Sequence, residues 1–94
     1  MNHPVRLTAD THRFLKHFEN GPLQLSKVRD LEMAVGGSVG RERRSLVGLR
    51  YAIAIHETWL ERIPDEVKGP LTMQDTAALT PKGIRMLAEY QPAE

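Results

Sequence analysis

The 94-residue sequence contains no cysteine, which excludes disulfide bonds, thiol catalysis and thiolate metal sites. Aromatic residues make up only 5% of the chain, so a hydrophobic core has to be built mainly from Leu, Ile, Val and Met. The formal net charge is +1, from 13 Lys and Arg against 12 Asp and Glu, and it provides no general attraction to a polyanion. Any affinity for nucleic acid therefore has to come from a local cluster of basic residues.

Long hydrophobic runs are also lacking. The N-terminal residues MNHPVRLTAD contain no apolar run after a basic region, so no signal peptide is expected, and no segment is long enough to span a bilayer. The length is that of one domain with a single core. We expect one domain over residues 1–94 of a cytoplasmic protein without a membrane partner.

No arrangement of residues typical of catalysis or metal binding is found. His12 and His17 are five positions apart, which turns them away from each other on a helix, and His56 and Glu57 are adjacent and point to different faces. The segment Gly36–Gly40 lacks the lysine of a phosphate-binding loop. We therefore expect no enzyme activity, no metal and no cofactor.

Capping residues, glycines and prolines divide the chain into helices and strands. Apolar residues at helical spacing predict the core side of each helix. We expect a first helix from Thr8 or Asp10 to Gly21 with Phe14, Leu15 and Phe18 in the core, followed by an extended or edge-strand piece at 22–25. A second helix, capped by Ser26, has Val28, Leu31 and Val35 in the core, and a glycine-rich turn at 36–40 connects it to a basic helix from Arg41 to about 56–58. Two strands lie within 59–79 around a polar loop at 64–70, and a last helix, capped by Thr80 and ended by Pro92, has Ile84, Leu87 and Ala88 in the core.

The basic helix has three lines of residues when it is placed on a wheel at about 100° per residue. The line predicted to face the core is Leu46, Leu49, Ile53 and Leu60. The second line, Ser45, Gly48 and Ala52, consists of small residues that permit close helix packing. The line predicted to be exposed is Arg43, Val47, Arg50 and Ala54, with Arg44 at its margin. The arginines are expected at the N-terminal end of this helix, where the helix dipole disfavours cations unless an anion is bound. A solvated helix face is the alternative interpretation of the cluster.

The order of elements resembles a winged-helix domain. The segments TWLERIPDEVKG and AALTPKGIRML are similar to the wing and following helix of regulators of the multiple-antibiotic-resistance type. GPLQLSKVRDL resembles the entry into the helix-turn-helix pair of that family, so that residues 8–90 are covered. Two features differ: Thr58 stands where the family has a glycine, and the chain has no room for the family's long dimerisation helices.

The resemblance implies an α+β, mainly α fold, a winged helix-turn-helix with three to four helices and a β-hairpin wing at about 59–79. It further implies a sequence-specific DNA-binding protein, a small transcriptional regulator that inserts its third helix in the major groove of double-stranded DNA. A homodimer is left open. The alternative is a winged-helix-like module that binds a protein and not DNA, with Val47 and Ala54 in the contact. The implied DNA contacts are Arg41, Arg43, Arg44, Val47, Arg50, Ser26, Lys27 and, on the wing, Lys68.

Overall fold

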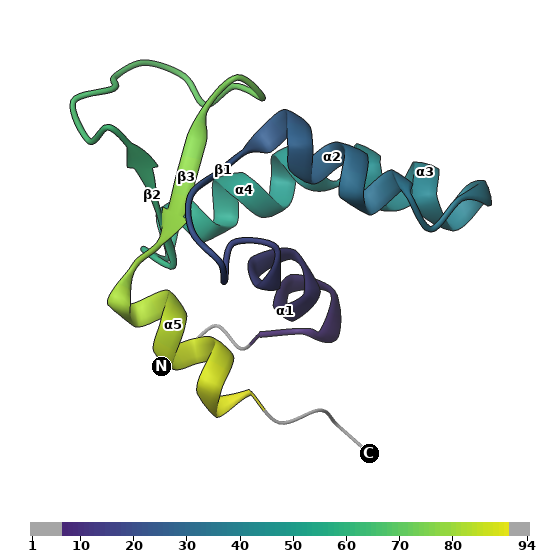
Figure 1. Ribbon diagram of the computed structural model, residues 1–94, viewed down its shortest axis with the longest axis horizontal. Coiled ribbons are helices and arrows are strands. Elements are labelled where there is room, and N and C mark those ends of the chain that lie inside the picture. Colours follow the sequence, from purple (N-terminus) through teal and green to yellow (C-terminus); the bar gives the residue numbers. More distant parts are fainter. Residues whose placement is uncertain (1–6, 91–94) are drawn as a thin grey trace, which may run out of the picture.

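A computed structural model describes residues 7–90, which form five helices and a three-stranded antiparallel sheet (Figure 1). The fold is a small, mainly helical α+β fold, with one helix more than the largest number predicted. The N-terminal segment and the predicted helix end at Pro92 lie outside the described residues. In chain order the elements are α1 (Ala9–Lys16), β1 (Leu23–Gln24), α2 (Leu25–Met33), α3 (Gly37–Ser45), α4 (Val47–His56), β2 (Leu60–Ile63), β3 (Thr76–Leu79) and α5 (Pro81–Glu89).

The sheet has the strand order β1-β3-β2, with β3 in the centre. Leu23 pairs with Ala77, and Leu60 pairs with Leu79, so the short piece after Gly21 is an edge strand and the predicted hairpin is present. The return strand begins at Thr76 and not at residue 71. Residues 71–75 instead form a loop whose carbonyls accept hydrogen bonds from the first turn of α2.

The core lies where α1, α2, α4 and the sheet meet. Figure 1 shows α1 between α5 and the layer that contains α2 and α4. The three predicted core residues of the first helix are fully or almost fully buried, as is Leu60. The buried apolar residues are Phe14, Leu15, Phe18, Leu25, Val28, Val47, Tyr51, Ala54, Trp59, Leu60 and Ala77.

The predicted basic helix is two helices, because the chain breaks at Leu46. The Leu46 N–H donates to the carbonyls of Glu42 and Arg43, both at 3.2 Å, which closes α3 in a tight turn. α4 begins at the next residue, and the N–H of Arg50 donates to the Leu46 carbonyl at 2.9 Å. A single wheel over residues 41–63 therefore combines two helices that do not share one axis.

The buried face of α4 is the opposite of the predicted one. Val47, Tyr51 and Ala54 are 0% exposed, whereas Leu49 is 58% and Ile53 is 39% exposed. The predicted exposure of Val47 and Ala54 and the predicted core positions of Leu49 and Ile53 are wrong. Val47, Tyr51 and Ala54 form one apolar line along α4, and Leu49 and Ile53 form another. The fold buries the line that includes Tyr51, the large aromatic residue.

Other expectations about helix faces and starts also need correction. Leu31, Val35 and Ile84 were expected in the core but are 45%, 56% and 56% exposed, and Ala88 is exposed as well. The glycine-rich segment after residue 36 is the first turn of α3 and not a linker. Gly40 allows α3 to lie against α2, because a Cβ there would be 2.8 Å from the Met33 carbonyl oxygen.

The start of α5 is docked on the corner between α4 and β2. Thr80 caps α5 as predicted, since its Oγ1 accepts from the Gly83 N–H at 3.0 Å, and its own N–H donates to the Trp59 carbonyl at 3.0 Å. A Cβ at Gly83 would collide with that same Trp59 carbonyl. The sequence Leu-Thr-Pro-Lys-Gly is therefore explained by this packing, next to Thr58, whose φ is +62°.

Candidate nucleic-acid interface

α3 carries three of the predicted contact arginines. Arg41 and Arg44 are exposed, and because they are three positions apart they lie on the same side of the helix. Arg43 is half-buried. Among residues 7–90, none of the three takes part in an ion pair. Arg43 and Arg44 lie in the last turn of α3, where the helix dipole favours cations, so the predicted placement at a helix N-terminus is wrong.

Arg50 is directed toward α1 and not toward solvent. Its guanidinium lies 3.6 Å from the Asp10 carboxylate, and its side chain is 15% exposed. Arg50 and Arg43 line a cavity of about 170 Å³ together with Asp10 and Glu42. The two acidic side chains offset the positive charge there, so this cavity is a poor site for an anion.

A buried carboxylate, Glu32, also belongs to this group of ion pairs, because Arg13 contacts both Asp10 and Glu32. Glu32 is 2% exposed and receives two hydrogen bonds from Arg13, each at 3.2 Å, and an Nε2 contact from His17 at 3.0 Å. Burial alone would raise the pKa of Glu32, but the hydrogen bonds from Arg13 and His17 lower it below its usual value. A hydrogen bond from Arg13 at 2.7 Å likewise lowers the pKa of Asp10. This network connects α1 to α2 and α4 and is structural.

Val47 does not face a ligand, because it is completely buried, and its assignment as a DNA contact is wrong. The outward face of α4 instead presents Gly48, Leu49, Ala52 and Ile53 and, at its C-terminal end, His56, all exposed. Apart from His56 in the last turn, these residues offer no side-chain hydrogen-bond donor to the edge of a base. Base readout by α4 is therefore not supported by its surface.

Ser26 and Lys27 lie in the first turn of α2, where the predicted cap is shifted by two residues. Gln24 is at the N-cap position, so Ser26 is inside the helix and does not cap it. The N–H groups of Leu25 and Ser26 donate to the carbonyls of Asp75 and Met73, both at 2.9 Å. A phosphate at this helix start would need free backbone N–H groups, and those of Leu25 and Ser26 are already bonded to carbonyls. Lys27, beside them, remains exposed.

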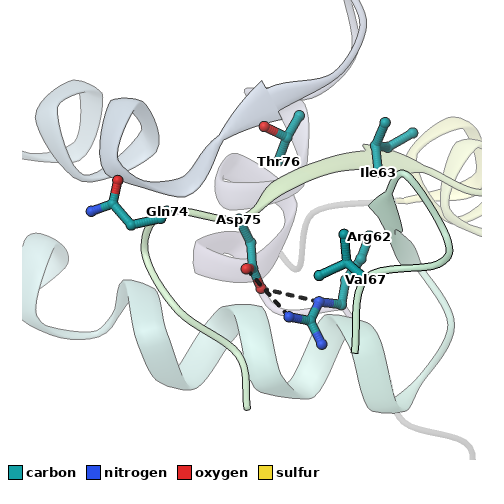
Figure 2. A pocket seen from close by; sticks show the side chains of 6 residues that line it. All are labelled: Arg62, Ile63, Val67, Gln74, Asp75 and Thr76. Carbon is teal, nitrogen blue, oxygen red and sulfur yellow. Dashed lines mark hydrogen bonds and ion pairs between the residues drawn. The ribbon is translucent and has the colours of Figure 1, made fainter. Parts of the chain in front are cut away.

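Lys68 is exposed on the loop that joins β2 to β3, in the company of Asp65 and Glu66. Figure 2 shows the base of this loop, where Arg62 and Asp75 point toward each other and both line a cavity of about 180 Å³. The Arg62 Nε lies 3.2 Å from an Asp75 carboxylate oxygen.

Two further contacts fix the base of the loop. Arg62 donates to the Gly69 carbonyl at 2.7 Å, and the Tyr51 hydroxyl donates to Asp75 at 2.7 Å. Burial and this hydrogen bond to Asp75 raise the pKa of Tyr51. Burial alone would raise the pKa of Asp75, but the hydrogen bonds from Tyr51, Thr72 and Arg62 lower it. The loop is thus held by a partly buried polar cluster, and its tip is more acidic than basic.

The structure brings only part of the predicted set together. Arg41 and Arg44 share one side of α3, whereas Arg43 and Arg50 face Asp10. The contributions of Asp10, Glu32, Arg62 and Asp75 were missed. Nothing local in the sequence indicates their ion pairs, because the oppositely charged partners lie between 13 and 40 residues away along the chain, apart from the Arg13–Asp10 pair.

Comparison of the chain with protein-family models, with curated proteins and with solved structures finds no match. Within residues 7–90, no group of three or more His, Asp or Glu side chains is placed to hold a metal ion. None of the five described helices has the length and apolar character needed to cross a membrane.

Proposed function

We propose that this chain is a small DNA-binding domain of the winged-helix type that acts as a transcriptional regulator. The order of elements supports this: a helix, a strand, further helices, and a hairpin whose β3 also pairs with the first strand. The observation that carries the proposal is the pair of exposed arginines, Arg41 and Arg44, on one side of α3 without ion-pair partners among residues 7–90.

The contact surface differs from the one inferred from the sequence alone. Val47 is buried and Arg50 forms an ion pair with Asp10, so neither is available to a ligand. The DNA contact is therefore assigned to α3 rather than to α4. The planar guanidinium groups of Arg41 and Arg44 can donate in pairs to phosphate oxygens or to the major-groove edge of guanine. Lys27 and Lys68 are weaker contributors, the latter because acidic neighbours surround it.

A titration of duplex DNA across salt concentrations tests the proposal. Each phosphate contact releases counterions and contributes about 0.9 to the slope of log K against log salt. The double variant Arg41→Ala with Arg44→Ala should reduce that slope by roughly two. The control is Arg85→Ala, the same change at an exposed arginine of α5, which should leave it unchanged. Absence of any affinity for duplex DNA at low salt would refute the proposal.

A protein-binding module without DNA binding is the second candidate. It is favoured by the outward face of α4, where Leu49 and Ile53 are exposed. In that case Leu49 and Ile53 take the role that was expected of Val47 and Ala54. The same titration separates the two candidates, because a protein-binding module without DNA binding shows no affinity for duplex DNA at low salt.

A further inference from the structure

α4 is apolar on both its faces, although the fold buries only one of them. Its sequence VGLRYAIAIH contains one arginine and otherwise only small, apolar or aromatic residues and a terminal histidine. A helix that is apolar all round is normally buried all round. In this chain Leu49 and Ile53 stay 58% and 39% exposed, so the second face of α4 has no cover within residues 7–90.

Apolar residues follow one another at helical spacing along the uncovered side of α4, and one apolar residue of α3 lies beside their first member. The half-buried N-cap residue Leu46 and the exposed Leu49 and Ile53 of α4 follow each other at i, i+3 and i+7, which is the spacing of one helix side. Val39, on α3 and 49% exposed, lines the same cavity as Leu46. We call the residues Val39, Leu46, Leu49 and Ile53 the outer stripe.

The rim of the outer stripe carries both signs of charge. Arg43, Arg50, Asp10 and Glu42 line the cavity at its edge. Beside the stripe lie Gly48 and Ala52, both exposed, and a Cβ at Gly48 would meet no atom within 4 Å. Large apolar side chains thus stand next to two small residues on the same helix.

We propose that a second copy of this chain covers the outer stripe, in a two-fold dimer in which α4 packs against α4 of the partner. In an isologous contact each surface meets itself, so Leu49 and Ile53 of one copy can pack over the small residues Gly48 and Ala52 of the other. The mixed rim suits such self-pairing, since Arg43 of one copy can meet Glu42 of the other. A net charge of +1 adds little repulsion between copies.

Other occupants fit this surface less well. A nucleic acid would need donors where the stripe has only apolar side chains. An anionic membrane surface would gain no net attraction, because the carboxylates of Asp10 and Glu42 offset the two arginines at the rim. Neither a nucleic acid nor a membrane would make use of both signs of charge at the rim, whereas a second copy of this chain would.

The dimer is compatible with the proposed function and does not rest on it. On the α3 wheel, Arg41 and Arg44 lie about 160° and about 140° away from Val39 at 100° per residue. They therefore stay accessible when the outer stripe is covered. The dimer would present two copies of α3, as proteins that bind paired half-sites do.

Sedimentation equilibrium of the full chain, from low micromolar to near-millimolar concentration, tests the dimer. Because the contact is small compared with a standard interface, we expect a dissociation constant on the order of micromolar. The variant Leu49→Asp with Ile53→Asp should be monomeric with an unchanged circular dichroism spectrum, since both side chains are exposed in the folded monomer. The matched control is Ile84→Asp, an equally exposed apolar residue on α5, which should leave the dimer intact.

Disulfide cross-linking gives a second test of the dimer, and it does not depend on how the substitutions affect the stability of the fold. The chain has no cysteine, so Ala52→Cys introduces a single thiol beside the outer stripe, and oxidation should yield a covalent dimer. Ala88→Cys, at an exposed alanine of α5, should not. A monomer at every concentration, or a dimer that survives the two aspartates or is lost with Ile84→Asp, would overturn the proposal, whatever the DNA titration shows.

Discussion

Thr58 offers a sharp test of how this fold is held at the corner between α4 and β2. Its φ of +62° is in the left-handed region, which is unusual for a β-branched residue. The Thr58 N–H donates to the Ile55 carbonyl at 3.1 Å and the Trp59 N–H to the Ala54 carbonyl at 2.8 Å. These two hydrogen bonds form a Schellman motif, whose left-handed position is usually occupied by glycine.

The expected effect of Thr58→Gly can be worked out from this geometry. The Cβ in the left-handed conformation costs roughly 1–2 kcal/mol, and the substitution removes that cost. Glycine adds conformational freedom to the unfolded chain, which opposes the gain by about 0.5–1 kcal/mol. The Thr58 hydroxyl donates only to the adjacent Glu57 carbonyl, at an exposed position, and its loss matters little. The net expectation is a gain in unfolding free energy of about 0.5–1 kcal/mol, or roughly 2–8 °C in Tm.

Urea and thermal denaturation of the wild type, Thr58→Gly and Thr58→Ala measure this effect. Alanine keeps the Cβ that causes the strain, so Thr58→Ala should be close to the wild type in stability. The urea m-value should not change, because the folded surface is the same. The reasoning is refuted if the glycine variant is no more stable than the alanine variant.

Two further predictions concern close packing and the buried carboxylate. Gly83→Ala should destabilise by about 1–3 kcal/mol, because the new methyl meets a backbone carbonyl that cannot move aside; Gly48→Ala, in open space, should gain about 0.5–1 kcal/mol in the same urea assay. Glu32→Gln should cost roughly 2–3 kcal/mol because Arg13 loses its buried counter-charge. Since the pKa values of Glu32, Asp10 and Asp75 are lowered by folding, the unfolded state binds more protons in acid. Stability should be lost as the pH falls below the usual values of 4.5 for Glu32 and 3.8 for the two aspartates toward their lowered values in the folded state. Glu32→Gln should make this loss, measured from urea midpoints at each pH, less steep, and an unchanged pH profile would contradict the prediction.

Signals that act within a few residues predicted much of the fold. Phe14, Leu15 and Phe18 were identified as core because α1 has one apolar side and a polar remainder. Thr80 was identified as a cap because the threonine and the proline after it favour the same helix start. The hairpin was located by the prolines and polar residues between its strands.

The orientation of α4 could not be predicted, for a physical reason. Val47, Tyr51 and Ala54 form one apolar line and Leu49 and Ile53 another, so periodicity gives no preference between the two faces. Contacts far apart in the sequence decide it, among them the hydrogen bond from Tyr51 to Asp75 and the ion pair of Arg50 with Asp10. The predicted reading face failed for the same reason, because it was placed on the line that the fold buries.

Asp75 connects three elements that are distant in the sequence. Its carboxylate binds Tyr51 of α4 and Arg62 of β2, while its backbone carbonyl accepts from Leu25 of α2. The hairpin and the helices are consequently preorganised as one rigid unit. A partner that contacts both α2 and the loop after β2 would meet a surface already in its bound shape, and little conformational entropy would be lost on association.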